Sequence, residues 1–138
     1  MSELIRFGVS IENDLLEKFD HLIQERNYFN RSEAIRDLIR SELVREQWQD
    51  SEAEAVGTIT IIYDHEVGDL PHLLTHIQHD FHQQIISTMH VHLDNNHCLE
   101  VLALKGQTKI IRKIANKLIS LKGVKHGKLV MTTSGKDV

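Results

Sequence analysis

The feature that most constrains this chain is a lone strand pattern at its start, followed directly by two amphipathic helices. Residues 4–12 alternate between apolar and polar side chains, which predicts a half-buried strand. Apolar residues then recur at helical spacing over 13–26 and 30–48. Because one strand cannot stand alone, we expect a twofold dimer in which two copies pair these strands. The paired ribbon would present outward Arg6, Gly8 and Ser10, in a form that fits the major groove of DNA.

The second half of the chain has a different pattern, in which strands and helices alternate. Residues 49–55 are acidic and lack bulky apolar groups, so we place a linker there, after a first domain of residues 1–48. The strands are expected at 56–63, 85–93, 98–105 and 124–132, and the helices at 69–84 and 110–119. The order βαββαβ over 56–132 predicts a ferredoxin-like α+β sandwich with two helices over a four-stranded antiparallel sheet. We expect residues 133–138 to form a flexible tail.

Composition limits the class of protein to which the chain can belong. A single cysteine excludes an intrachain disulfide and suits the reducing cytoplasm, where we place the protein. The chain has no apolar run long enough to span a bilayer, and its first residues lack the character of a signal peptide. The net charge is −4, and the first 50 residues alone, with seven Lys or Arg and eleven Asp or Glu, also carry −4. Any affinity for DNA must therefore come from a local arrangement of side chains.

Three potential metal ligands fall within nine residues of one another. His90 and His92 are two apart on an expected strand, so both side chains leave the same face, and Cys98 follows them. A two-residue turn at 95–96 would send the thiol to the opposite face, whereas a loop of five residues, 93–97, would pair Cys98 with His92. We expect the second register, which brings the three donors together and sets Glu100 beside His90 as a hydrogen-bonding partner.

Two imidazoles and one thiol leave a position to fill around a metal ion. The helix at 69–84 offers four further histidines, which are His72, His76, His79 and His82. Such a ligand set suits tetrahedral zinc or square-planar nickel or copper(II), and the donor types alone do not decide between these ions. At their helical spacing, His72, His76 and His79 could equally form a solvated polar face or a weaker accessory site. We treat His65, His97 and His126 as surface or turn residues.

Other classes of function fit parts of this pattern. A zinc metalloenzyme would use an open metal site with Glu100 as the general base, but no nucleophile or glycine-rich phosphate loop accompanies the ligands. A sensor of a small organic ligand, built on the second domain, would need no metal at all. Metal storage by surface histidines would be weak and would not depend on Cys98.

The chain resembles the nickel-responsive transcriptional regulators, the NikR family, over essentially its whole length. The resemblance rests on three motifs, which are Asn30–Asp37 (NRSEAIRD), His90–Glu100 (HVHLDNNHCLE) and Gly123–Gly127 (GVKHG). It implies a ribbon-helix-helix DNA-binding domain joined to an ACT-like regulatory domain. It also implies a homotetramer, a dimer of dimers in which two DNA-binding dimers flank a tetrameric core. Nickel loading would favour binding to a palindromic double-stranded DNA operator, usually to repress nickel uptake, with no membrane and no organic substrate involved.

The same resemblance implies the ligands of two cations. One Ni(II) per subunit would be bound by His90, His92 and Cys98 of one chain and by His79 of a neighbouring chain. Glu33 and Asp37 match positions that help to hold a second cation, often K⁺, between the domains. The ordinary alternative for these two carboxylates is that one caps its helix and the other pairs with Arg40 or Arg36.

In the first domain, the resemblance assigns base readout to the outward strand residues Arg6, Gly8 and Ser10. Gly8 departs from the family pattern, in which a small hydroxyl residue is common, because it has no side chain to read a base edge. Arg31 and Ser32, together with the amides at the start of the second helix, are placed to contact phosphate. The alternative is a helix cap and a solvent-facing arginine.

Overall fold

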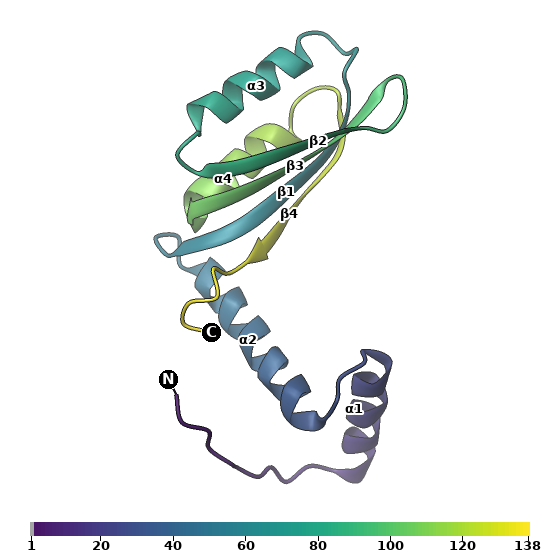
Figure 1. The fold of residues 1–138 in the computed structure, drawn as a ribbon, viewed down its shortest axis with the longest axis vertical. Helices are drawn as coiled ribbons and strands as arrows, with labels where there is room; N and C mark the ends of the chain where they lie inside the picture. The colour runs from purple at the N-terminus through teal and green to yellow at the C-terminus, as the bar shows by residue number, and fades with distance from the viewer. Residues whose placement is uncertain (1) are drawn as a thin grey trace. The chain divides into compact units, whose positions relative to one another are not determined.

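The computed structural model describes residues 2–138, which form two compact units. The first unit ends at Ser41, and the second runs from Glu42 to Val138. Figure 1 labels the helices and strands in the order in which the chain forms them. Within residues 2–138, no helix is long and apolar enough to cross a membrane.

The first unit consists of helix α1 (Asn13–Glu25) and the first part of helix α2 (Arg31–Gln49). As the sequence predicts, Asn30 caps α2, because its Oδ1 accepts the backbone N–H of Glu33 at 2.9 Å. Residues 2–12 run as a trace without helix or strand in Figure 1, so the strand expected at 4–12 is not formed in the single chain. The physical reason is that a strand needs a neighbour to pair with, and residues 2–138 of one chain supply none to this segment.

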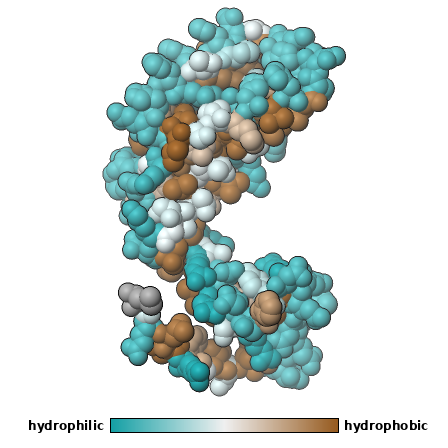
Figure 2. All heavy atoms as spheres, in the orientation of Figure 1, coloured by the Kyte–Doolittle hydropathy of each residue, from teal (hydrophilic) through white to brown (hydrophobic). Residues whose placement is uncertain are grey.

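The apolar side chains of this N-terminal segment stay in solvent as a result. Ile5 is 82% exposed, Phe7 is 70% exposed and Val9 is 68% exposed. Figure 2 shows apolar side chains, in brown, on the surface of the first unit. In α1 and α2 of this unit, only Ile23 and Ala34 are buried. A single copy therefore leaves the first unit without a core of its own.

The second unit has the predicted βαββαβ order. Its elements are β1 (Glu54–Asp64), α3 (Leu70–Asp80), β2 (Ile85–His92), β3 (His97–Gln107), α4 (Thr108–Ile119) and β4 (Val124–Thr132). All neighbouring strands are antiparallel and lie in the order β2-β3-β1-β4, which confirms the ferredoxin-like sandwich. Helix α3 is shorter than the expected 69–84, because residues 81–84 turn the chain into β2. Residues 133–138 contain no helix or strand.

The core lies between the sheet and its two helices, which Figure 1 shows on the same side of the sheet. Buried and half-buried residues alternate along β1 and β3, as expected for strands with one covered face. The largest buried aliphatic side chains, all fully inaccessible, are Ile59, Ile61, Leu102, Leu104, Ile111, Ile114 and Leu118. Because Tyr63, Cys98 and Glu100 are buried on the same face, the core continues directly into the predicted metal-binding region.

The stretch expected to be a linker, residues 49–55, is fastened to the second unit. The carbonyl of Ala53 accepts the backbone N–H of Thr108 at 3.0 Å. At the end of α2, Trp48 is only 2% exposed and its indole N–H donates to the carbonyl of Thr132 at 2.9 Å. The compact units accordingly divide inside α2, after Ser41, seven residues before the expected boundary at residue 48.

Candidate metal centre and nucleic-acid interface

The register between β2 and β3 is the one that the sequence predicts. His92 lies opposite Cys98, and His90 lies opposite Glu100. The turn between the strands is built on Asp94, whose Oδ1 accepts the backbone N–H groups of Asn96 and His97 at 2.8 Å each. Because directly opposed residues share a face, the two imidazoles, the thiol and the Glu100 carboxylate all project from the side of the sheet that the helices cover.

The atoms closest to the thiol include one donor that we did not expect. The Sγ atom of Cys98 lies 3.5 Å from Nδ1 of His92 and 3.4 Å from Nδ1 of His65. One potential ligand atom from each of these three residues lies within 4.8 Å of those of the other two. His65 does lie in a turn, as expected, but its ring also lies beside the thiol. His65 is here because it follows the end of β1, where Tyr63 pairs with Cys98, and because its N–H donates to the carbonyl of Asn96 at 3.0 Å.

His90 lies beside this group but faces other partners. Its Nδ1 is 3.2 Å from the hydroxyl of Tyr63 and 3.6 Å from Oε1 of Glu100. The ring centroids of His90 and His92 are 4.9 Å apart. Glu100 thus occupies the expected place beside His90, and the Nε2 atom of His90 is the ring nitrogen not engaged by these contacts. A ligating histidine commonly has this arrangement, in which one nitrogen is oriented by a carboxylate and the other is left for a metal.

Burial sets the electrostatics of the thiol and its neighbours. Cys98 is fully inaccessible, and this burial, together with the negative charge of Glu100, raises the pKa of the Cys98 thiol. Burial and the Glu100 charge likewise raise the pKa of Tyr63. Glu100 is 6% exposed, and its Oε2 atom is buried without a hydrogen-bond partner among the described residues. A buried carboxylate oxygen without a partner, next to a thiol and imidazoles, fits a site built to receive a cation.

The fourth predicted ligand, His79, does not join this group within the single chain. His79 is exposed near the C-terminal end of α3, where its ring stacks on that of His82 with centroids 6.1 Å apart. On the same helix His72 is exposed and His76 approaches Asp80 at 3.5 Å. At the start of β3, His97 contacts Asp94 at 3.1 Å. These contacts are typical of surface histidines.

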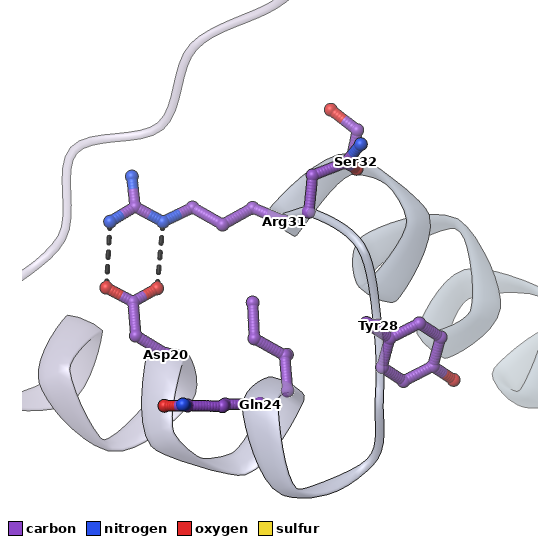
Figure 3. A pocket seen from close by; sticks show the side chains of 7 residues that line it. Asp20, Gln24, Tyr28, Arg31 and Ser32 are labelled. Atoms are coloured by element: carbon purple, nitrogen blue, oxygen red, sulfur yellow. Dashed lines mark hydrogen bonds and ion pairs between the residues drawn. The ribbon is translucent and has the colours of Figure 1, made fainter.

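In the first unit, the residues expected to contact DNA are all exposed. Arg6, Gly8 and Ser10 lie in the extended N-terminal segment. Figure 3 shows that Arg31 is held by Asp20 across the turn between α1 and α2, through two N–H···O bonds of 2.8 Å. This hydrogen bond to the guanidinium lowers the pKa of the Asp20 carboxyl. The pair lines one side of an open cleft of about 560 Å³, which Ser32 also lines. The guanidinium expected to contact phosphate is therefore ion-paired in the free chain.

The two carboxylates assigned to a second cation are also engaged. Asp37 accepts a 2.7 Å hydrogen bond from the hydroxyl of Tyr28 and pairs with Arg40 at 3.1 Å. The Tyr28 hydrogen bond lowers the pKa of Asp37. Glu33 pairs with Arg36. In the free chain both carboxylates therefore pair with arginines, which was the alternative to binding a cation.

Comparison with known proteins assigns each of the two parts of the chain to a protein family. Residues 56–132 match the family described as "NikR C terminal nickel binding domain", and residues 2–46 match "Ribbon-helix-helix protein, copG family". Proteins named "Putative nickel-responsive regulator" are similar along the whole chain. The one from Solibacter usitatus is 57% identical over 100% of this chain and 99% of its own length. The one from Pyrococcus furiosus is 56% identical, covering 98% of each chain.

A solved structure supports the fold of part of the chain. The uncharacterized protein TM1266 from Thermotoga maritima aligns with a TM-score of 0.53 and 20% sequence identity, covering 58% of this chain and 99% of its own. At this identity the likeness concerns the fold alone. The domain matches and the full-length relatives are stronger evidence for the family, because both predicted domains are matched in their predicted order. The chain therefore belongs to the NikR family of nickel-responsive regulators, in which a ribbon-helix-helix domain precedes a nickel-binding domain.

Proposed function

We propose that this protein is a nickel-dependent transcriptional regulator that binds operator DNA through paired N-terminal ribbons. The observation that carries the proposal is the β2–β3 register, which places His92 opposite Cys98 and His90 opposite Glu100. These strands follow, along the chain, a segment that matches a ribbon-helix-helix domain. Two imidazoles and a thiol, with a carboxylate that orients one of the imidazoles, suit a late first-row divalent metal ion. A cytoplasmic location follows from a role at an operator.

For the metal centre, we infer one Ni(II) per subunit, held by His90, His92 and Cys98 of one chain and by His79 of a neighbouring copy. When bound, a square-planar nickel ion supplies a rigid link between the two chains. The residues of this chain prepare for it in distinct ways. Tyr63 and Glu100 orient the His90 ring, and the buried Cys98 thiol must give up its proton before its sulfur can bind. The exposure of His79 keeps its ring available to another subunit.

Two exposed apolar surfaces support assembly into a dimer of dimers. The first is the N-terminal segment, where Phe7 and Val9 are mostly in solvent until a second copy pairs with it. The second is the face of the sheet opposite the helices, where Met89 is 56% exposed and Val130 is 49% exposed. Apolar surfaces of this kind are usually covered by a partner. A homotetramer would cover both surfaces and bring His79 to the metal ligands of its neighbour.

DNA recognition is assigned to the first unit. Arg6 and Ser10 would read base edges from the ribbon, while Gly8 would allow close approach without reading a base. Arg31 and Ser32 would contact phosphate, which requires the phosphate to take the place of Asp20 beside the guanidinium. Repression of nickel uptake at a palindromic operator is the regulatory outcome that we infer.

A second cation, such as K⁺, would bind the carboxylates of Glu33 and Asp37. Both carboxylates are half-exposed and paired with arginines in the free chain, so the cation would compete with Arg36 and Arg40. The competition predicts weak binding unless bound DNA draws the arginines away. This part of the proposal is independent of the nickel centre.

A gel-shift titration of operator DNA, with and without Ni(II), tests the proposal. We expect Ni(II) to tighten binding by about tenfold or more, because coupling between sites is typically about 1–3 kcal/mol. His92→Ala should abolish this difference, whereas His21→Ala, an exposed histidine of α1, should preserve it. Equal affinity with and without nickel would contradict the proposal. A diamagnetic nickel centre with a thiolate charge-transfer band, lost in Cys98→Ser, would establish the coordination.

A further inference from the structure

The charged residues of the chain are divided unevenly along its sequence. Residues 1–100 contain seven Lys or Arg and 19 Asp or Glu, whereas residues 101–138 contain nine Lys or Arg and one Asp. The first stretch therefore has a net charge of −12 and the second a net charge of +8. An asymmetry of this size is typical of a chain in which one segment binds a polyanion. The segment with positive charge is not the one expected to read DNA bases, which lies in the acidic stretch.

Helix α4 gathers much of this positive charge on one surface. It contains four basic residues and no acidic residue, and all four side chains are exposed. We call Lys109, Arg112, Lys113 and Lys117 the basic face of α4. The three lysines are four residues apart, so they follow one another along the same side of the helix at intervals of about 6 Å. The basic face lines an open groove of about 550 Å³.

The contacts of the basic face leave most of its charge without a counter-ion. The guanidinium of Arg112 lies 5.6 Å from the ring centroid of Trp48 and donates to the Trp48 carbonyl at 3.2 Å. The Nζ atom of Lys117 lies 5.3 Å from the ring centroid of Phe81. Contacts with an aromatic ring or a carbonyl hold a cation in place but do not neutralise it.

One acidic side chain reaches the basic face from the part of the chain that the structure describes. It is Glu52, which pairs with Lys109. Within residues 2–138, Arg112, Lys113 and Lys117 form no ion pair with a carboxylate. A surface with three uncompensated positive charges along one helix is suited to a partner that carries a row of negative charges.

We propose that the basic face of α4 is a second, sequence-independent contact with DNA, at which its side chains hold phosphates of the duplex backbone. The proposal rests on the proposed function in one respect, which is that the N-terminal ribbon brings the protein to DNA. It adds a contact from the metal-binding domain to those of the ribbon-helix-helix domain. This contact positions the protein on the duplex and reads no base.

The composition of the α4 surface favours DNA over a protein partner. Lysine is depleted from the centres of protein–protein interfaces, which are rich in aromatic and apolar side chains. The large apolar side chains that the described residues expose include none from α4. The groove is completed by Asn116 and Ser120, whose amide and hydroxyl groups are among the neutral groups that bond to phosphate oxygens. Apolar surface suited to a second copy lies instead on the N-terminal segment and on the open face of the sheet.

The test measures how strongly salt weakens DNA binding by the full-length, nickel-loaded protein. One probe is a duplex of arbitrary sequence and the other carries the operator. The variant combines Lys113→Gln with Lys117→Gln, which removes two charges and keeps a good helix former at each position. The control combines Lys125→Gln with Lys136→Gln, which removes two charges from exposed lysines of the same unit outside α4.

The basic-face variant should have a shallower dependence of log affinity on log salt on both probes. Each lost phosphate contact lowers the slope by about 0.9, so the slope should fall by about two for each basic face that contacts DNA. Between 50 and 200 mM salt, the wild type should then lose about tenfold more affinity than the variant. Because the contact reads no base, the ratio of operator to arbitrary-sequence affinity should stay within about twofold. DNA should also protect Lys113 and Lys117, but not Lys125, from acylation mapped by mass spectrometry.

Two results would overturn the proposal. The first is a slope equal to that of the control variant, which would leave the basic face to an acidic protein. The second is a change in oligomeric state of the basic-face variant in analytical ultracentrifugation, which would make the face an interface between copies. Failure of the proposed function is read separately, as the absence of a nickel-dependent preference for the operator. The measurements on the duplex of arbitrary sequence would still decide whether α4 contacts DNA.

Discussion

Glu100→Gln is expected to weaken nickel binding by about tenfold. The carboxylate is 6% exposed, and its Oε1 lies 3.6 Å from Nδ1 of His90. Loss of the outer partner of a ligating histidine typically costs about 10–100-fold in metal affinity. The separation is longer than a good hydrogen bond, and the Tyr63 hydroxyl shares the same nitrogen at 3.2 Å. We therefore expect the lower end of the range, which corresponds to about 1.4 kcal/mol of binding free energy.

The assay is a competition titration of Ni(II) against a chelator at fixed pH. Glu66→Gln is the matched control, because it removes the same charge from an exposed side chain next to His65. The substitution keeps the shape of the side chain, so the fold should be retained, and thermal unfolding of the metal-free protein checks this. If Glu100→Gln and Glu66→Gln bind nickel equally, within about twofold, the carboxylate does not orient His90 and the reasoning is refuted.

Three further predictions concern other parts of the chain. Gly127→Ala places a Cβ atom 2.5 Å from the nearest atom of α4, so we expect a loss of about 1–3 kcal/mol in the free energy of unfolding, measured in urea. Tyr28→Phe removes the hydrogen bond that lowers the pKa of Asp37, so this pKa should rise towards its ordinary value in an NMR titration of the carboxyl carbons. Because a lowered pKa gives stability that is lost as the pH falls through the folded-state value, the variant should lose less stability between neutral and strongly acid pH. Asp20→Asn frees the Arg31 guanidinium, so non-specific DNA binding should tighten and its dependence on salt should steepen by about one ion; an unchanged slope would mean that Arg31 does not contact phosphate.

The β2–β3 register could be predicted from the sequence because it depends on local geometry alone. His90 and His92 share a face through the period of two along a strand, and an odd number of intervening residues returns Cys98 to that face. The same reasoning anticipates Glu100 beside His90. The βαββαβ order follows equally from hydrophobic periodicity, and the observed bounds of β4 match the expected 124–132.

The position of His65 depends on which strands are neighbours, and periodicity along the chain does not contain that information. The ferredoxin-like order nevertheless offers a signal, because it places β1 beside β3 and so brings the end of β1 close to the start of β3. A histidine two residues beyond Tyr63 was therefore a candidate ligand once the fold class was assigned. The contact between Asp20 and Arg31 was harder to anticipate, because it depends on how two helices meet across a turn.

The N-terminal segment and His79 illustrate a different limit, since the roles that we propose for them involve more than one copy of the chain. Alternation over residues 4–12 is a valid strand signal, yet a single chain leaves the segment unpaired and its apolar side chains in solvent. His79 is likewise exposed and separate from the other donors of its own chain. In both cases the role that we propose needs a second copy, so the single chain could show only one side of each proposed contact.

The charge of the protein and the state of Arg31 favour a regulator that binds DNA weakly by default. The chain carries a net charge of −4, and one of its expected phosphate contacts is already neutralised by Asp20. A single DNA-binding dimer of this kind gains little from counterion release, which supplies most non-specific affinity. Joining two such dimers through a metal-linked core can raise the overall affinity by a factor of 10² or more without any new contact, provided that both reach their half-sites together. Weak individual dimers are then an advantage, because a strongly basic dimer would bind DNA whether or not nickel was present. On this argument the acidic composition, which at first argues against a DNA-binding protein, would make the response of DNA binding to metal steeper.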